Sequence, residues 1–304
     1  MSTTYCFQPR SLVQWTCCVA ENRLQIMFPV LYSIGAFEFR TFNFFIVLAF
    51  LMTAFLFWKK GREEHYPEVQ LFDGFLLATM VGFLAGRVGY VLSVLPMLGW
   101  SVFKWIDIFG YPGISGAIGV FAAILYLYHY AKEHKWDAFE ILDFFVLSVA
   151  GGLGVGYIGL FFDGSAIGIP TELPWGVTFQ GLQEPHHPTQ LYFAIFFFLF
   201  SWYLARVEYK YRTYEWYRSG KKTAQTGFLV SVFVVATTAF YFAMSWFKPP
   251  VFSYFGVNGD RIVAFMGLLY GCWLLYHRSG RTLFHKKKML VSAPEESSNE
   301  TPSN

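Results

Sequence analysis

Arg87 is the residue of this sequence best placed to do chemistry, because it is the only lysine or arginine in the apolar segment Leu71–Leu95. Ionisable groups within long apolar segments are rare and are usually functional. A guanidinium matches the shape and charge of a phosphate, so we expect Arg87 to face an anionic phosphate group. The alternative is a structural role, in which Arg87 pairs with a carboxylate or with carbonyl groups at a helix end.

A second group of polar residues lies between Asp163 and His187, a stretch without lysine or arginine that contains Trp175 and the pair His186–His187. The side chains of adjacent residues diverge, so the two histidines form a poor metal site, and the sequence predicts neither a metal nor a cofactor. His187 is a weak candidate for a catalytic base or a headgroup ligand. The alternative is that His187 caps the start of the following helix.

The segments that position these residues are apolar. The chain of 304 residues is 55% hydrophobic and only 14% charged, whereas soluble domains carry about 25% charged residues. It therefore has too few polar side chains to cover a soluble globule, and its net charge of +3 is too small to indicate a nucleic-acid partner. A bilayer span needs about 20 mostly apolar residues. The candidate spans are Phe42–Trp58, Leu71–Leu95, Ile114–Tyr130, Ala138–Phe162, Thr189–Arg206, Thr226–Phe247 and Arg261–Tyr276.

These segments predict an all-α polytopic membrane bundle with about seven transmembrane helices. They are too long for barrel strands and do not alternate. Lysines and arginines concentrate after the first, third, fifth and seventh segments. The positive-inside rule therefore places the N-terminus outside and the C-terminus in the cytoplasm. Three basic residues on the outer side depart from this pattern: Lys104, Lys248 and Arg261.

The sequence divides into three parts. Residues 1–26 hold three of the four cysteines, and they lack the features of a span or a signal peptide, so we expect an N-terminal extension outside the fold. Residues 27–278 are predicted to form the membrane domain. Residues 279–304 are predicted to form a basic and then polar, disordered cytoplasmic tail.

Buried charges and glycines have structural interpretations. Asp73 and Asp143 lie near the predicted cytoplasmic face, and we interpret them mainly as charges at helix N-termini. Glycines cluster in Gly110–Gly119 and Gly151–Gly159. Their main interpretation is close helix packing, because small residues let backbones approach one another. The alternative is that backbone comes close to a ligand headgroup.

Several motifs, in their order along the chain, resemble the prolipoprotein diacylglyceryl transferase family. They are FPVLYSIGAFEFRTF at 28–42, GRVGYVL at 86–92, SGAIGV at 115–120, GIPTELPWGV at 168–177 and HPTQLY at 187–192. The resemblance extends from about Met27 to His277. It implies a seven-span enzyme of the bacterial inner membrane, which moves diacylglyceryl from phosphatidylglycerol to the lipobox cysteine thiol of exported prolipoproteins.

The sequence also departs from the signature of that family. The resemblance implies that the signature positions substituted here are Phe42, Ile114, Tyr157, Leu160, Ser165 and Tyr241. Arginines of the family fall on Tyr157 and Tyr241, and its histidine falls on Ile114. Lys248 stands where the family has a further arginine.

Six residues toward the outer ends of the spans are predicted to bind the lipid: Arg87, Tyr90, Asp163, Gly168, Gln190 and Tyr192. Four of them, Arg87, Tyr90, Asp163 and Gln190, are expected to meet in a polar cavity near the outer leaflet. The expected ligand is phosphatidylglycerol or another anionic phospholipid, and lipobox-containing prolipoproteins are the expected protein partners.

Three functions fit these patterns. The first is a divergent transferase with weak or lost activity, which uses Arg87 to hold phosphate and His187 as a base. The second is a non-catalytic homologue that binds lipid or a partner protein on the same fold. The third, a transporter or channel, is disfavoured because ionisable residues do not line several spans.

Overall fold

The computed structural model describes residues 30–34, 37–95, 99, 101–107, 110–111, 113–210, 226–250, 253–254 and 257–278. The predictions for residues 1–26 and 279–304 lie outside this part of the chain. In the described part, eight helices account for nearly all regular structure. They are α1 (Thr41–Glu63), α2 (Glu68–Ser93), α4 (Val102–Ile106), α5 (Gly116–Glu133), α6 (Ala138–Asp163), α7 (Thr189–Glu208), α9 (Phe228–Met244) and α10 (Gly259–Arg278).

Each of the seven candidate spans coincides with one of the seven long helices. Helices α1, α2, α6 and α7 are long and apolar enough to cross a membrane, and α9 is a shorter apolar helix. The chain is therefore a helical membrane protein. The all-α prediction missed two short antiparallel pairs, β1 (Val30–Ile34) with β2 (Phe37–Arg40), and β3 (Ser253–Tyr254) with β4 (Val257–Asn258).

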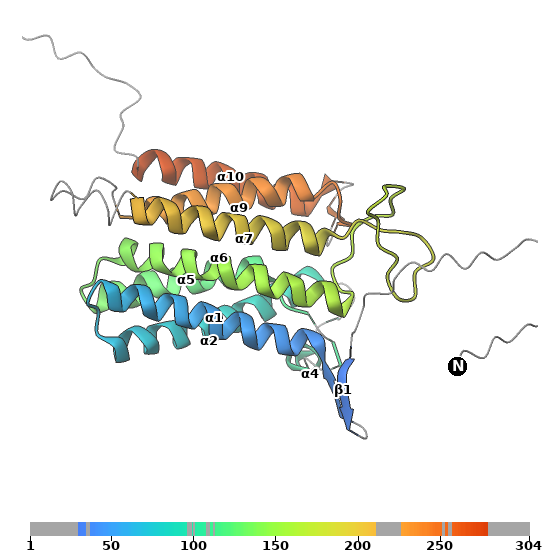
Figure 1. Ribbon diagram of the computed structural model, residues 1–304, viewed down its shortest axis with the longest axis horizontal. Coiled ribbons are helices and arrows are strands. Elements are labelled where there is room, and N and C mark those ends of the chain that lie inside the picture. Colours follow the sequence, from blue (N-terminus) through green and yellow to red (C-terminus); the bar gives the residue numbers. More distant parts are fainter. Residues whose placement is uncertain are drawn as a thin grey trace, which may run out of the picture.

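The long helices run side by side, and successive helices point in opposite directions (Figure 1). The turns that join α1 to α2 and α5 to α6 lie at one end of the bundle (Figure 1). The hairpin of β1 and β2, helix α4 and the 164–188 connection between α6 and α7 lie at the other end (Figure 1). The two basic connections within the described part of the chain, α1 to α2 and α5 to α6, thus lie at the end opposite the 164–188 connection (Figure 1).

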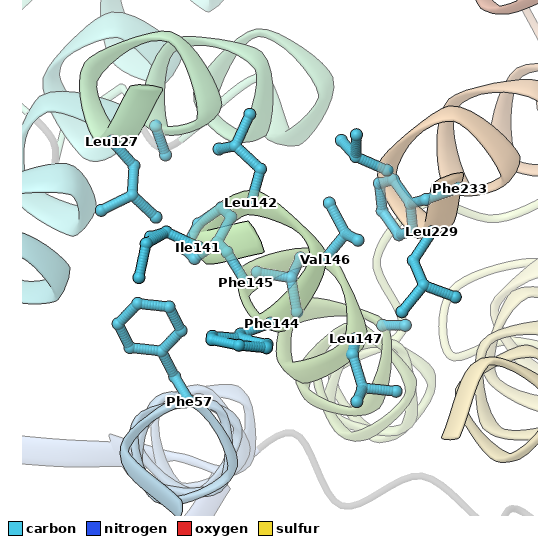
Figure 2. Packing of buried hydrophobic residues seen from close by; sticks show 14 of the residues in the cluster. Phe57, Leu127, Ile141, Leu142, Phe144, Phe145, Val146, Leu147, Leu229 and Phe233 are labelled. Atoms are coloured by element: carbon cyan, nitrogen blue, oxygen red, sulfur yellow. The ribbon is translucent and has the colours of Figure 1, made fainter. Parts of the chain in front are cut away.

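Helix α6 is the centre of the bundle, and it packs against α1, α5, α7 and α9. Its sequence is apolar on every side, which is the pattern of a helix buried all round. Figure 2 shows Phe144 and Phe145 of α6 among Phe57 of α1, Leu127 of α5 and Phe233 of α9. A charge on any face of α6 would therefore contact protein rather than lipid.

Glycines allow this packing, as the sequence predicted. A Cβ at Gly82 of α2 would lie 2.8 Å from the carbonyl oxygen of Gly119 in α5, and a Cβ at Gly119 would lie 2.9 Å from that of Gly82. On the other side, a Cβ at Gly152 of α6 would lie 3.0 Å from the Ala49 carbonyl oxygen in α1. Side chains at these positions would force the helices apart, so close packing explains these glycines.

The turns after α1 and α5 have the same geometry. Each ends its helix with a residue in the left-handed region, His65 (φ 63°) and Lys135 (φ 58°). The next residue in each turn is aromatic, and its backbone N–H donates to the carbonyl five residues earlier. Tyr66 donates to Gly61 at 3.0 Å, and Trp136 donates to Ala131 at 2.9 Å. This is the Schellman arrangement. The rings of Tyr66 and Trp136 meet edge to face, 5.2 Å apart, so the two turns pack directly on each other.

Asp143 acts at a helix N-terminus, as expected, but the helix is α9 and not its own helix α6. Its carboxylate accepts the backbone N–H groups of Gly227 and Val230 at 2.8 and 2.9 Å. A carboxylate is favoured at this end of a helix because the first N–H groups lack helical partners. The contact ties the start of α9 to the central helix.

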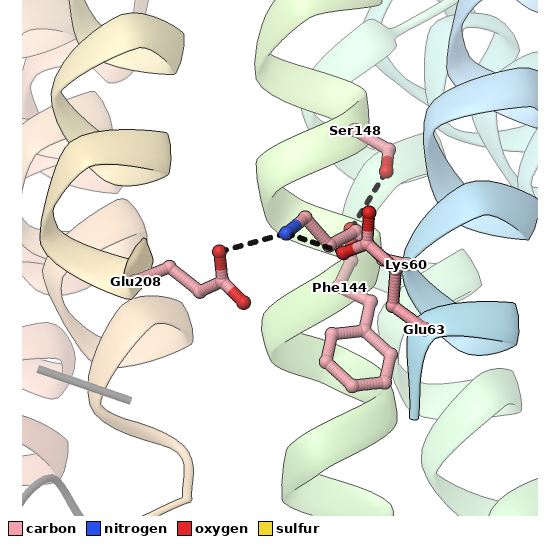
Figure 3. Close-up of polar contacts among 5 residues, drawn as sticks. All are labelled: Lys60, Glu63, Phe144, Ser148 and Glu208. Carbon is pink, nitrogen blue, oxygen red and sulfur yellow. Dashed lines mark hydrogen bonds and ion pairs between the residues drawn. The ribbon is translucent and has the colours of Figure 1, made fainter. Parts of the chain in front are cut away.

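A second buried charge joins α1 to α7. The ammonium of Lys60 lies 2.9 Å from a carboxylate oxygen of Glu208, whose side chain is only 4% exposed, and 2.9 Å from one of Glu63 (Figure 3). Taking Lys60 away would leave the Glu208 carboxylate buried without its cation, which costs far more than an exposed pair contributes.

We expect Lys60→Met to lower the free energy of unfolding by about 3 kcal/mol, because it isolates the Glu208 carboxylate. The double variant Lys60→Met/Glu208→Gln removes both charges and should recover most of that loss. Thermal unfolding in detergent micelles measures both variants. Equal losses in the single and double variants would show that the ion pair does not carry the effect.

Candidate functional site

Arg87 is buried, and backbone carbonyls accept all of its N–H groups. Nε donates to the carbonyl of Trp105, Nη1 donates to those of Tyr111 and Gly113, and Nη2 donates to those of Lys104 and Asp107, at 2.7 to 3.4 Å. A guanidinium has five N–H donors, so none is left for a phosphate. This is the structural alternative: Arg87 fastens the 104–113 segment, which includes α4, to helix α2.

The other polar residues of the predicted lipid site form separate contacts. Tyr90 lies beside Arg87, with its ring centroid 5.7 Å from the Arg87 Cζ atom. Asp163 accepts the hydroxyl of Ser165, and the side-chain amide of Gln190 donates to the Ser165 carbonyl at 2.5 Å. Among the described residues, no hydrogen bond or ring contact joins the first pair to the second. Asp163 and Gln190 instead brace the start of the 164–188 connection.

His187 is buried at the end of this connection, in a short chain of polar contacts. The indole N–H of Trp175 donates to the Tyr192 hydroxyl at 2.9 Å, and that hydroxyl lies 3.3 Å from Nδ1 of His187. The Tyr192 hydroxyl can accept the indole proton and still either donate to Nδ1 or accept from it, so both neutral tautomers of His187 fit this contact.

Gly168 holds the connection against its neighbours. Its N–H donates to the His187 carbonyl at 3.2 Å, and the next N–H, of Ile169, donates to the Phe247 carbonyl at 2.9 Å. A Cβ at Gly168 would lie 2.7 Å from the Cβ and carbonyl oxygen of His187 and 2.8 Å from the Phe247 carbonyl oxygen. Protein atoms fill the space at Gly168, so its role in this structure is close packing.

The two tyrosines to which the resemblance assigned arginines lie against the same ring. Tyr157 of α6 stacks on Phe193 of α7, with centroids 4.7 Å apart and planes 10° apart, and also on Phe197. Tyr241 of α9 lies 5.3 Å from Phe193. Tyr157 and Tyr241 therefore converge on Phe193 and form an aromatic stack with it.

Lys248 completes this group as its single cation. Its ammonium nitrogen lies 4.5 Å from the centre of the Phe193 ring and 5.7 Å from that of Tyr241. Burial lowers the pKa of Lys248 to about 8, and the negative charge of Asp260 acts in the opposite direction. No hydrogen bond or ion pair joins its ammonium to any described residue. Lys248, Phe193 and Tyr241 are the lysine–aromatic site, and it can hold one anionic group.

The remaining substituted positions are divided between packing and turns. Phe42 contacts Gly159, and Ile114 contacts Gly86. The Leu160 carbonyl accepts the N–H of Ser165, which helps to close the end of α6. The described residues contain no cluster of three His, Cys, Asp or Glu side chains that could hold a metal.

Sequence reasoning missed the central part played by Phe193 and Lys248. One signal was available, since Lys248 was an exception to the positive-inside pattern. All three exceptions lie over aromatic rings: Lys104 over Tyr111 at 5.8 Å, Lys248 over Phe193, and Arg261 over Trp246 at 4.8 Å. An aromatic face stabilises a cation where no carboxylate is present.

Comparison with known proteins agrees with this architecture. A profile of the prolipoprotein diacylglyceryl transferase family matches residues 29–277. The phosphatidylglycerol–prolipoprotein diacylglyceryl transferase of Clostridium tetani is 30% identical over 220 residues, which are 69% of this chain and 80% of that enzyme. The enzyme of Pasteurella multocida is 29% identical over 73% of this chain and 79% of its own length. The enzyme of Wolbachia pipientis is 35% identical over 55% of this chain and 65% of its own length.

A polytopic helical membrane protein is the class that the fold defines. The chain belongs to the prolipoprotein diacylglyceryl transferase family, because the family profile covers most of its length.

We expect Arg87→Lys to lower the free energy of unfolding by at least about 2 kcal/mol. A lysine ammonium has three donors in place of five, so buried carbonyls lose their partners. Thermal unfolding measures the loss, with Arg206→Lys on the exposed end of α7 as the control. If stability is unchanged and phosphatidylglycerol binding falls, Arg87 is a lipid ligand after all.

Gly168→Ala should destabilise the protein by about 1–3 kcal/mol, because the new methyl group meets backbone atoms of His187 and Phe247 that have little room to move. Gly156→Ala is the matched control, since a Cβ at Gly156 meets nothing within 4 Å. Comparing the melting temperatures of both variants tests the prediction. A loss at Gly156 equal to that at Gly168 would contradict it.

Proposed function

We propose that this protein holds the headgroup of phosphatidylglycerol at the lysine–aromatic site and transfers its diacylglyceryl group slowly to the lipobox thiol of prolipoproteins. The observation that carries the proposal is the position of Lys248, an ammonium without an ion-pair partner among the described residues. It lies over Tyr241 and over Phe193, the ring on which Tyr157 also stacks. The named activity of the relatives supplies the reaction.

The reaction explains why we expect a slow rate. The thiolate sulfur forms a bond to a glyceryl carbon while the bond from that carbon to the phosphate oxygen breaks. The phosphate leaves with the electron pair and gains negative charge. Only interactions that strengthen in this transition state accelerate the step. Removing one donor of this kind typically costs about 100- to 1000-fold in rate, and Tyr157 and Tyr241 offer at most neutral hydrogen bonds.

Lys248 supports lipid binding at neutral pH. With a pKa of about 8, its side chain is mainly the ammonium at pH 7 and can pair with the single negative charge of phosphatidylglycerol. As the pH rises through about 8, the site loses its charge, so binding should weaken. Phe247, the residue before Lys248, packs on the His187 ring, 5.0 Å between centroids, and His187 contacts Tyr192. These contacts support a part for His187 and Tyr192 near the site.

A second candidate function is binding of lipid or a partner without transfer. The close stack of Tyr157 on Phe193 and Phe197 favours it, because these rings fill space that a charged catalytic group would need. The same scaffold then serves as a receptor for an anionic lipid.

For the membrane arrangement we propose seven spans in the bacterial inner membrane, with the N-terminus outside and the C-terminus in the cytoplasm. Support comes from the seven long antiparallel helices and from the basic connections at one end of the bundle (Figure 1). The lysine–aromatic site then faces the outer leaflet, where exported prolipoproteins are exposed.

Purified protein should bind phosphatidylglycerol, and Lys248→Gln should weaken that binding about 10-fold. Transfer to a lipobox peptide should be at least about 100-fold slower than by the Clostridium tetani enzyme assayed in parallel. Labelled lipid measures both quantities. A variant with Tyr157→Arg, Leu160→Asn, Ser165→Glu and Ile114→His should transfer faster than the unaltered chain.

Transfer by the unaltered chain at the rate of its relative would show that other residues perform the chemistry. Binding without measurable transfer in any variant would favour the second candidate function. Unchanged binding in Lys248→Gln would remove Lys248 from the site.

A further inference from the structure

The described residues contain three arginine–tryptophan pairs, Arg62 with Trp58, Arg206 with Trp202 and Arg261 with Trp246. The first and the last lie at opposite ends of the molecule, and they differ in one respect. At the end of α1, the Cζ atom of Arg62 lies 5.2 Å from the centre of the Trp58 ring. At the start of α10, the Cζ atom of Arg261 lies 4.8 Å from the centre of the Trp246 ring. Both pairs combine a guanidinium with the face of an indole, an arrangement that leaves the N–H groups available for an anion.

In the first pair an anion is already present. The Glu68 carboxylate accepts the indole N–H of Trp58 on one oxygen, at 2.9 Å, and lies 3.7 Å from Nε of Arg62 with the other. One planar anion thus lies between the indole, to which it is hydrogen-bonded, and the guanidinium, with which it forms an ion pair.

In the pair of Arg261 and Trp246, no described residue supplies an anion that takes the part of Glu68. Nε of Arg261 is buried without a hydrogen-bond partner. Stacking on Trp246 is the one ring contact of the Arg261 side chain, and no hydrogen bond or ion pair joins its guanidinium to a described residue. The negative charge of its neighbour Asp260 acts on Lys248. A guanidinium that lacks acceptors is costly. Its Nη1 and Nη2 groups are not among the buried atoms, so they are open to an acceptor from outside the chain.

The surroundings indicate what kind of molecule brings that anion. Trp246 is 49% exposed, and Ile262, Val263 and Phe265 expose apolar side chains on the first turns of α10. Tryptophan is favoured at the boundary between the acyl chains and the headgroups of a bilayer. An anion that reaches Arg261 at this level therefore comes attached to acyl chains or from the adjacent aqueous phase.

We propose that Arg261 and Trp246 form a second anion site, separate from the lysine–aromatic site, which binds the phosphate group of a phospholipid. One phosphate oxygen accepts the indole N–H of Trp246, as Glu68 does in the first pair. The other oxygens contact the Nη groups of Arg261, because Nε is buried. The guanidinium keeps its charge at all physiological pH values, so this site holds its ligand independently of pH. The proposal does not depend on transferase activity.

The test uses the full-length protein, delipidated in a maltoside detergent that contains no phosphate. Phosphatidylglycerol is titrated, and native mass spectrometry counts the bound lipids. The Lys248→Gln background isolates the second site from the first. In that background, Arg261→Gln should weaken binding by about 10- to 100-fold, the loss typical of hydrogen bonds to a charged group. Arg62→Gln, which alters the pair that already has its anion, should leave binding unchanged.

Trp246→Phe is the second variant, because it keeps an aromatic face and removes only the indole N–H. It should weaken binding by about 3- to 10-fold. Raising the pH from about 7 to about 9 should not change binding at this site. Inorganic phosphate in excess distinguishes the sources of the ligand: lipid that stays bound shows a headgroup site, and lipid that is displaced shows a site for free phosphate.

Equal binding by Arg261→Gln and the Lys248→Gln background would overturn the proposal. An equal loss in Arg62→Gln would also overturn it, since that result indicates a general effect of surface charge. If the chain with Lys248 intact binds only one phosphatidylglycerol and Arg261→Gln abolishes that binding, the second site stands and the lysine–aromatic site fails.

Discussion

Helix α6 is surrounded by protein, and the positions of its neighbours follow from that constraint. Its residues are apolar on all faces, and its glycines allow α1 to approach until backbone lies against backbone. Asp143, the charge in its buried first half, binds the N-terminus of α9. A helix packed in this way cannot rotate or slide without separating four partners. The residues at its outer end, Tyr157 and Asp163, are therefore held in fixed places.

The charges of the bundle fall into two classes. Arg87, Asp143 and Lys60 find all or most of their partners within the chain, and each joins segments that are distant in sequence. Such groups are expensive to bury and are tolerated because their hydrogen bonds are satisfied. Lys248 and Arg261 instead have aromatic faces and no hydrogen-bond acceptor among the described residues. The functional proposals concern this second class.

The aromatic stack around Phe193 gives a physical meaning to the departures from the family pattern. Positions that the resemblance assigned to arginines on two different helices contact one ring of a third. Paired arginines at such a place would repel each other unless an anion lay between them. Two tyrosines pack on the ring without an anion, and they leave Lys248 as the single charge. The aromatic packing thereby stabilises this part of the bundle without an anion.

The sequence by itself determined the seven long helices and the family, because hydropathy and motifs are read along a continuous stretch of chain. It also singled out Lys104, Lys248 and Arg261 as exceptions. It could not determine the role of Arg87, whose acceptors are backbone carbonyls from Lys104 to Gly113. Every residue has such a carbonyl, so no side-chain pattern marks the ones that will be used.

Only the tertiary structure decided which charged groups are satisfied. Asp143 reaches Gly227 across 84 positions of sequence, and Lys60 reaches Glu208 across 148. Arg62 and Arg261 each lie over a tryptophan, yet of these two only Arg62 forms an ion pair with a described carboxylate. The physical reason is that a buried charge is stabilised by whatever helix packing brings within about 4 Å. That proximity follows from the arrangement of helices and not from the residues beside it in the chain.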